Sequence, residues 1–445
     1  MRISEIYIKG LYGVYTYKIA NLLSQNLLVL TGYNGMGKTT ILNIVKNIAE
    51  SNLWFFYKLD FEEIKVSFED GLLLKMLSNN SEQAMFGNKE LQDENINPEK
   101  LLTYAWYRDK KLLSSVTVGR HNFYKAFTVI YKADYMPEDS NWPDLMPSKM
   151  KEIVAYLCKR QNAISFEMIQ SSIRAFMIPA QRVKQIHLVS EDDDSYPFPS
   201  SEMKEIDTVD VVAESLGDML EQKRIEFLSN VQESKNHLMD RLLDADTQVL
   251  SKDEYSAIAI DVQTKINALG QFGITYEKIR PYNEKNARLL SAYLLDLRDM
   301  LDKYIGLLND LNLFASILRE KHFLHKSISF SPTYGLKAFN EQGISINPSL
   351  LSSGEQNMVI LLYRMIFEVH DGDILLIDEP EISMHVVWLK EFIKDVQKIA
   401  SCKKNVQILI ATHSPQIVRG AEDSCFDLEM NNHGESCLRF FRRQG

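Results

Sequence analysis

The sequence predicts an α/β fold: a mixed, partly parallel sheet covered by helices, with an antiparallel flank, interrupted by an all-helical hairpin. Three observations support this. Residues 352–412 alternate helix, strand, helix and strand, the order typical of a parallel sheet. Residues 1–135 contain short alternating runs with hairpin signals. Residues 211–324 are helical in period and poor in glycine and proline, apart from one interruption.

Length and composition set the first limits. The chain has 445 residues, 45% of them hydrophobic, which is enough for two or three domains with their own cores. The net charge of −10 argues against a protein that coats DNA broadly, although a local basic groove stays open. None of the four cysteines forms a CxxC pair, and no long apolar run is present. We therefore expect a cytoplasmic protein without a signal peptide, membrane span or zinc ribbon.

The first 185 residues justify the mixed sheet. RISEIYIKG, VYTYKIA and NLLVLTG are predicted strands, and the helix TTILNIVKNIAE follows them directly. The runs FEEIKVSF and LLLKML flank Glu69-Asp70-Gly71, a hairpin signal. Further strands are expected at 114–119, 127–132 and 175–181, with a helix at MKEIVAYLCKR. We predict an N-terminal lobe at 1–185.

The helical insertion is predicted at 186–326. The acidic, proline-containing stretch 190–202 marks its start, and helices are expected at 211–250 and 286–324. Glycines and a proline interrupt the region between them, so each helix reaches at most about 60 Å. Residues 201–330 carry 16 Lys/Arg and 22 Asp/Glu, which places −6 of the net charge here. A solvated face is the simplest interpretation, a partner-docking surface comes second, and a DNA-binding arm comes last.

The C-terminal lobe is predicted at 327–445.

A phosphate loop is predicted in the N-terminal lobe. Residues 32–39 read GYNGMGKT, which matches GxxxxGK[ST] between an apolar strand and a helix. Glycines allow backbone N–H groups to turn toward phosphates, and the helix N-terminus adds its positive end. Lys38 would reach the phosphates and Thr39 would hold Mg²⁺. The residues expected to bind ATP here are Gly32, Asn34, Gly35, Gly37, Lys38, Thr39 and Thr40.

A pair of carboxylates ends a buried strand. The run DILLIDEP delivers Asp378 and Glu379 at the carboxyl end of its strand, where ligands usually bind in such sheets. Asp378 would hold Mg²⁺ through water, and Glu379 would accept the proton of an attacking water. Such a pair can also be only a helix N-cap. The phosphate loop in the same chain favours catalysis.

Three further sites are predicted, the first two with a structural alternative beside the functional one. LSSGEQ, at 351–356, opens a helix; it is either an N-cap box or an anion site built from exposed N–H groups and hydroxyls. His413 follows the apolar strand VQILIAT and is either structural or at the phosphate edge. Gln181 ends a predicted strand, where its amide could touch Mg²⁺ or water.

The order GYNGMGKT, Gln181, insertion, LSSGEQ, DILLIDEPE and ATHSP resembles the ABC-type ATPase head of SMC-like and DNA-repair ATPases, of the OLD family and of related bacterial defence ATPases. The resemblance covers 1–185 and 327–445. It implies a head-to-tail homodimer or higher homo-oligomer with ATP sandwiched between the phosphate loop of one copy and LSSGEQ of the other. Ser352 and Gly354 would then contact the γ-phosphate in trans. Gln181 would sense Mg²⁺ and water, and His413 would contact the γ-phosphate in cis.

Two positions depart from the transporter and SMC patterns. Transporters usually carry Asp seven residues after Asp378, where this sequence has His385, and this DEPExxxH pattern looks like the OLD and defence branch. Near the first strands, Leu11-Tyr12-Gly13 replaces the Phe-Arg of many SMC-like ATPases. Tyr12 could stack on adenine or could be a core tyrosine.

No effector is evident in the sequence. The chain lacks long coiled coils and a zinc hook, and only about thirty residues follow His413, too few for the Toprim nuclease domain of OLD proteins. His322 and His325 are interpreted as solvated. The sequence therefore looks most like the ATPase of PARIS-type anti-phage systems, whose partner is a separate Toprim-like nuclease. The alternatives are a DNA-repair ATPase like RecF-type proteins and a nucleotide-gated binding module with little hydrolysis.

Overall fold

The computed structural model describes residues 1–24, 26–80, 100–131, 147–161, 163, 172–189, 202–243, 249–321, 323 and 326–431. The chain falls into two compact units, which we describe separately. Unit 1 comprises Met1–Gln181, Leu188–Glu202 and Val369–Gly445, and unit 2 comprises Arg182–His187 and Met203–Glu368. The acidic stretch at 190–201, His322, His325 and the C-terminal basic run at 439–443 lie outside the described residues.

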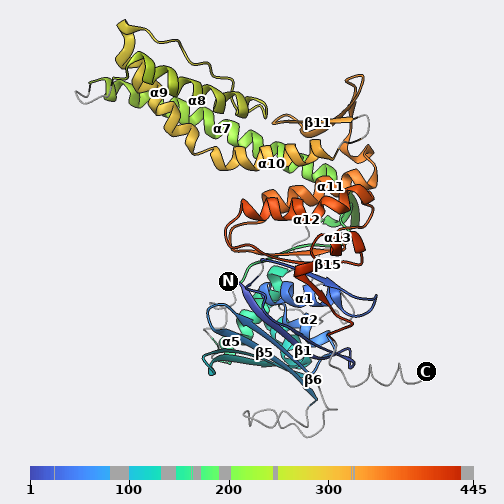
Figure 1. The fold of residues 1–445 in the computed structure, drawn as a ribbon. Coiled ribbons are helices and arrows are strands. Elements are labelled where there is room, and N and C mark those ends of the chain that lie inside the picture. Colours follow the sequence, from blue (N-terminus) through green and yellow to red (C-terminus); the bar gives the residue numbers. More distant parts are fainter. Residues whose placement is uncertain are drawn as a thin grey trace. The chain divides into compact units, whose positions relative to one another are not determined.

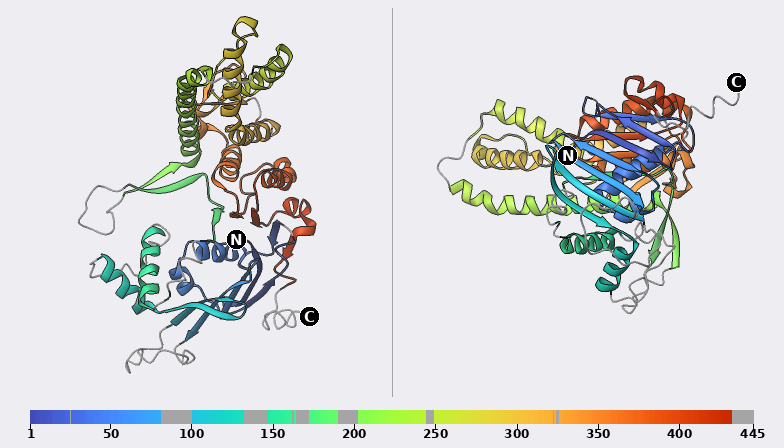
Figure 2. Two further views of the ribbon diagram at one scale, coloured as in Figure 1. Left: turned by 90° about the vertical axis from the view of Figure 1, so that its left-hand side faces the viewer. Right: turned by 90° about the horizontal axis from the view of Figure 1, so that it is seen from below.

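One sheet of unit 1 is antiparallel and six-stranded, in the order β2-β1-β4-β5-β6-β7 (Figure 2). Its strands are β1 (Ile3–Leu11), β2 (Tyr15–Ile19), β4 (Glu63–Phe68), β5 (Leu72–Asn80), β6 (Lys100–Arg108) and β7 (Lys111–Val118). Burial alternates along β4, because successive side chains point to opposite faces of a sheet. One face of this sheet therefore lines the core of the unit.

The second sheet of unit 1 is parallel, in the order β16-β3-β15-β14-β8. Its strands are β3 (Leu27–Thr31), β8 (Ala175–Ile178), β14 (Ile374–Asp378), β15 (Gln407–Ala411) and β16 (Cys425–Asp427). Every residue of β14 and β15 is buried, as expected for strands covered on both faces. All five carboxyl ends lie at one edge, and this edge carries the phosphate loop.

Helices cover both faces of the parallel sheet. Helix α1 (Lys38–Ala49) buries its apolar stripe in the core shared by the two sheets of unit 1. Helices α12 (Val386–Ser401) and α13 (Pro415–Arg419) lie on the other side of β15 (Figure 1). Helices α2 (Leu53–Lys58), α3 (Arg120–Tyr131) and α5 (Pro147–Arg160) also belong to this unit.

Some predicted elements of unit 1 were wrong or absent. The strand predicted at 127–132 is wrong, because residues 127–131 belong to α3. The β-branched run favoured a strand, but Phe123, Ala126 and Phe127 repeat at helical spacing and are all buried, so packing overrides propensity. Helix α2 and the strands β6 and β16 were not predicted.

Unit 2 combines a helical arm with a small sheet. The arm consists of α7 (Thr208–Leu243), α8 (Lys252–Gly270), α9 (Ala287–Asp302) and α10 (Ile305–Glu320). Figure 1 shows α7, α8 and α9 alongside one another, in agreement with their contacts. The sheet contains β11 (Lys326–Ser331), β12 (Gly335–Asn340) and β13 (Ser345–Ile346). Helix α11 (Ser353–Tyr363) follows the short helix η2 (Pro348–Leu350) and continues into a π-helical turn at Arg364–Glu368.

The arm corrects the predicted two-helix hairpin. Helix α8 forms within the interrupted region, because Ser251 and Glu254 build a reciprocal capping box at its start. The helix predicted at 286–324 is two helices, which break at Lys303 and Tyr304. Two further strands, β9 (Lys184–Val189) and β10 (Glu202–Asp207), pair with each other.

The predicted α/β fold with a helical insertion is confirmed. Within the described residues, no helix is both long enough and apolar enough to cross a membrane.

Candidate nucleotide site

The phosphate loop joins β3 to α1 and depends on glycine at several positions. Gly32, Gly35 and Gly37 have φ values of 142°, 83° and 89°, which side chains rarely adopt. A Cβ on Gly37 would lie 2.9 Å from Cδ2 of Leu11. The loop is anchored at Met36, whose carbonyl accepts a 2.9 Å hydrogen bond from the Tyr17 hydroxyl. Its tip is exposed, including Asn34 and Gly35.

Lys38 folds back onto this loop. Its Nζ donates to the carbonyl oxygens of Gly32, at 2.9 Å, and Tyr33, at 3.1 Å. It also lies 3.3 Å from Nδ1 of His413. Burial lowers the pKa of the Lys38 ammonium below its ordinary value, although nearby carboxylates act in the opposite direction. The charge is therefore held on backbone carbonyls at the edge where strands end.

Thr39 and Asp378 form the candidate metal site. The Thr39 hydroxyl donates to Oδ1 of Asp378 at 2.9 Å. Asp378 is only 5% exposed, and burial raises the pKa of its carboxyl above the ordinary value. The Thr39 bond opposes this rise in pKa, while the carboxylates of Glu379 and Glu381 add to it. A hydroxyl and a carboxylate are hard oxygen donors that suit Mg²⁺, and a cation here would relieve the crowding of negative charge.

Glu379 has a strained backbone. Its φ is +41°, unusual for any residue but glycine and unfavourable before a proline such as Pro380. Its N–H donates to the Ala411 carbonyl at 2.8 Å, which fixes the turn against β15. Its Oε1 lies 3.4 Å from Nε2 of His413. His413 thus stands between Lys38 and Glu379, one imidazole nitrogen toward each.

Glu381 is a site residue that sequence reasoning missed. Its Oε1 accepts from the backbone N–H of His413 at 2.6 Å and from the Thr412 hydroxyl at 2.8 Å. It therefore holds the turn that carries His413. The only signal was its place in DEPE, because a contact across two loops has no local pattern in the sequence.

Three other positions are placed by the structure. Tyr12 is 45% exposed, which excludes the core interpretation, and its hydroxyl is hydrogen-bonded to that of Thr40 beside the phosphate loop. His385 is the N-cap of α12, and its Nδ1 accepts from the Val387 N–H at 3.3 Å. Gln181 is exposed three residues beyond β8, and no hydrogen bond joins it to the described residues.

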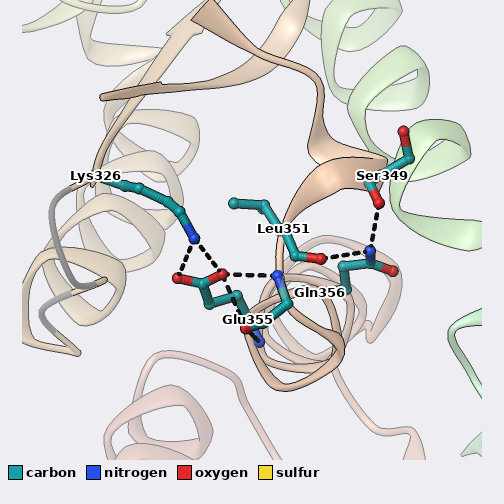
Figure 3. A network of polar contacts seen from close by, with 6 residues as sticks. Lys326, Ser349, Leu351, Glu355 and Gln356 are labelled. Carbon is teal, nitrogen blue, oxygen red and sulfur yellow. Dashed lines mark hydrogen bonds and ion pairs between the residues drawn. The ribbon is translucent and has the colours of Figure 1, made fainter. Parts of the chain in front are cut away.

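The LSSGEQ segment lies in unit 2, where it starts α11 (Figure 3). Ser352 is the N-cap, with the capping box that the sequence allowed: its N–H donates to Oε2 of Glu355 at 2.8 Å. Nε2 of Gln356 donates to the carbonyls of Ser349, at 2.8 Å, and Leu351, at 2.9 Å. Gly354 occupies the first turn of the helix.

These features define a class. A phosphate loop between strand and helix, with a lysine, a threonine and a buried aspartate at the carboxyl edge of a parallel sheet, is typical of a P-loop nucleotide-binding protein. Within the described residues, no group of three or more His, Cys, Asp or Glu side chains could hold a metal. Among the predicted metal ligands, the Thr39 hydroxyl and the Asp378 carboxylate are in direct contact.

Comparison with known proteins gives the family. The family described as AAA ATPase domain matches residues 1–418, and the chain belongs to it. The ATPase predicted from the motifs is thereby confirmed.

Individual relatives are more distant. The chain is 31% identical over 75 residues to protein ea59 of Escherichia phage lambda, a stretch that spans 17% of this chain and 14% of that relative. Among solved structures, it is similar to an SMC head bound to the C-winged helix domain of ScpA (TM-score 0.36, 10% identity, 94% and 92% of the two chains covered). It is also similar to the SMC head domain from Thermotoga maritima (TM-score 0.33, 11% identity, 96% and 94% covered).

Proposed function

We propose that this ATPase hydrolyses ATP at the edge formed by the phosphate loop and the ends of β14 and β15. The carrying observation is that Lys38 and Glu379 both approach His413, while Thr39 contacts Asp378. These side chains come from three separate segments: the phosphate loop, the end of β14 and the turn after β15. Their convergence supports one reaction centre.

The roles follow from chemistry. The loop N–H groups and Lys38 bind the phosphates, and Glu379 accepts the proton of the attacking water. His413 contacts the γ-phosphate through the imidazole that now lies beside Lys38. Tyr12 offers an exposed aromatic face for the base. Gln181 keeps its proposed role near Mg²⁺ and water, which no contact of the described residues supports.

Thr39 and Asp378 would hold Mg²⁺. The ion, when bound, would neutralise charge that develops on the phosphate oxygens. Asp378 fits this role because its carboxylate is buried, hydrogen-bonded to Thr39 and close to other carboxylates. Gln181 is the third proposed ligand.

The second half of the site would come from another copy. The start of α11 presents helix N–H groups and the Ser352 hydroxyl, which suit a phosphate oxygen. We place Ser352 and Gly354 against the γ-phosphate of ATP bound to the partner copy, in a head-to-tail homodimer. Hydrolysis would then be possible only in the assembled pair.

The test of catalysis compares wild type with Glu379→Gln. Losing the base should slow phosphate release by about a hundredfold or more, while ATP binding persists. Lys38→Ala should instead lose ATP binding, because the phosphates lose their cation. The exposed helix residue Glu391→Gln serves as the control and should hydrolyse like wild type. Wild-type rates in Glu379→Gln would contradict the assigned base.

For the biological role, we propose a sensor and scaffold that controls a separate effector, a Toprim-like nuclease, in bacterial anti-phage defence. The acidic arm supports a protein partner over DNA. Purification of Glu379→Gln with ATP, followed by mass spectrometry, should recover a nuclease. The DNA-repair alternative predicts instead that the isolated protein binds DNA tightly at physiological salt, and this result would contradict the proposal.

A further inference from the structure

The start of α11 contacts residues at both ends of the helical arm, where the chain enters the arm and where it leaves it. At the entry of the arm, Asp210 of α7 accepts hydrogen bonds from the backbone and side chain of Ser349, whose carbonyl holds Gln356. At the exit, Lys326 of β11 contacts Glu355. Figure 3 shows Lys326 and Ser349 on opposite sides of this helix start.

The contact between Lys326 and Glu355 is close and largely buried. Nζ of Lys326 donates to both carboxylate oxygens of Glu355, at 3.0 and 2.8 Å. The side chain of Glu355 is 8% exposed and that of Lys326 is 24% exposed. Burial by itself would raise the pKa of Glu355, but Lys326 and Ser352 outweigh it, and the pKa lies below its ordinary value. The carboxylate is therefore ionised at neutral pH.

Glu355 in turn fixes the orientation of Ser352 through hydrogen bonds. Its Oε2 accepts from the Ser352 N–H at 2.8 Å and from the Ser352 hydroxyl at 2.9 Å. The carboxylate orients the residue that would meet a phosphate. It also places a negative charge beside that phosphate, which repels it unless a cation compensates. Lys326 is the cation bonded to both oxygens.

We propose that Lys326 is a positioning residue for ATP-dependent pairing: it neutralises and orients Glu355, which keeps Ser352 set to receive a phosphate of ATP bound to a second copy. This rests on the proposed head-to-tail pair. Lys326 follows the last helix of the arm after five residues, so displacement of this end of the arm would uncover the charge of Glu355. The arm thereby gains a means of regulating pairing.

The experiment measures dimer dissociation constants by sedimentation in the Glu379→Gln background, with ATP and Mg²⁺. Lys326→Met should weaken pairing about tenfold or more, because it leaves a buried charge unpaired. Lys326→Arg should restore most of it. Lys326→Met combined with Glu355→Gln should pair more tightly than Lys326→Met alone, because the uncompensated charge is gone. ATP binding by the separated copies should be equal throughout.

Lys265→Met is the matched control. Lys265 is 21% exposed and bonds Asp261 and Asp302 at 2.8 Å, but within the arm. Its loss should leave pairing unchanged.

The outcomes separate the two proposals. If the Glu379→Gln background forms no dimer with ATP, the proposed function and this inference both fail. If it pairs and Lys326→Met pairs equally well, only the inference is overturned. Equal weakening in Lys326→Met and in the double variant would reduce Lys326 to a structural role and overturn it too. If Lys326→Met does not fold, Glu355→Gln alone carries the test. Its amide oxygen can still accept from Ser352 but bears no charge, so it should pair within a few-fold of the background. A loss as large as that expected for Lys326→Met would overturn the charge argument.

Discussion

At the scale of single residues, the site concentrates charge where water is largely excluded. Asp378 and Lys38 are each 5% exposed. Burial raises the pKa of the Asp378 carboxyl and lowers the pKa of the Lys38 ammonium, so it favours the neutral form of each group. Buried charges that suit a bound phosphate and cation lower the stability of the folded protein when these ligands are absent. Functional sites of this kind are therefore often less stable than they could be. Glu379 adds a strained backbone to the same turn.

Asp378→Asn should therefore raise the melting temperature of the protein without nucleotide or Mg²⁺ by a few degrees, and abolish hydrolysis. The sign follows from linkage: a carboxyl whose folded pKa is raised carries no penalty below its unfolded pKa, and the penalty grows as pH rises through the folded pKa. The stabilisation should thus be present at pH 7 and shrink toward pH 4. Thermal unfolding of both proteins at several pH values measures it. A melting temperature at pH 7 below that of wild type would contradict the predicted cost.

At the scale of elements, the turn between β11 and β12 packs directly on α7. A Cβ on Gly335 would lie 1.6 Å from the Ala213 carbonyl oxygen and 2.8 Å from the Gly217 nitrogen, both backbone atoms. Neither can move without displacing the helix. This close approach joins the arm to the small sheet within unit 2.

Gly335→Ala should consequently destabilise the protein by more than about 3 kcal/mol. Gly343→Ala is the matched control in the next turn of the same sheet. Its φ is +78°, similar to the +63° of Gly335, but its Cβ would meet nothing within 4 Å. It should cost only the backbone term of about 1 kcal/mol. Denaturant unfolding of both variants gives the comparison, and equal losses would mean that the helix yields easily.

At the scale of the whole molecule, the proposed site is divided between two copies. Lys38→Ala removes the cation of the phosphate loop and should prevent ATP binding. Gly354→Asp places a carboxylate where the phosphate of the partner copy's ATP would bind. An acidic residue in the first turn suits the helix dipole, so Gly354→Asp should still fold. A mixed dimer of the two variants would retain one intact site.

Each variant alone should hydrolyse almost no ATP, whereas an equal mixture should recover about a quarter of the wild-type rate. Random association makes half of the dimers mixed, each with one of two sites intact. Phosphate release measured across mixing ratios should peak at equal amounts. Absence of recovery at every ratio would contradict a site completed in trans.

The nucleotide-binding motifs of this protein could be recognised from the sequence alone. The phosphate loop and the strand that delivers Asp378 and Glu379 are contiguous, and their geometry depends only on a strand, a turn and a helix. The LSSGEQ cap was equally local. These motifs sufficed to predict an ATPase of this fold class.

Tertiary structure alone decided which of these residues meet. The contacts of His413 with Lys38 and Glu379 depend on the strand order β3-β15-β14, which pairs segments hundreds of residues apart. Glu381 meets His413 over 32 residues and Lys326 meets Glu355 over 29 residues, separations that no local pattern spans. Strand propensity also failed where packing prevailed, in α3. Local patterns encode local geometry, whereas long-range contacts arise from the packing of the whole chain.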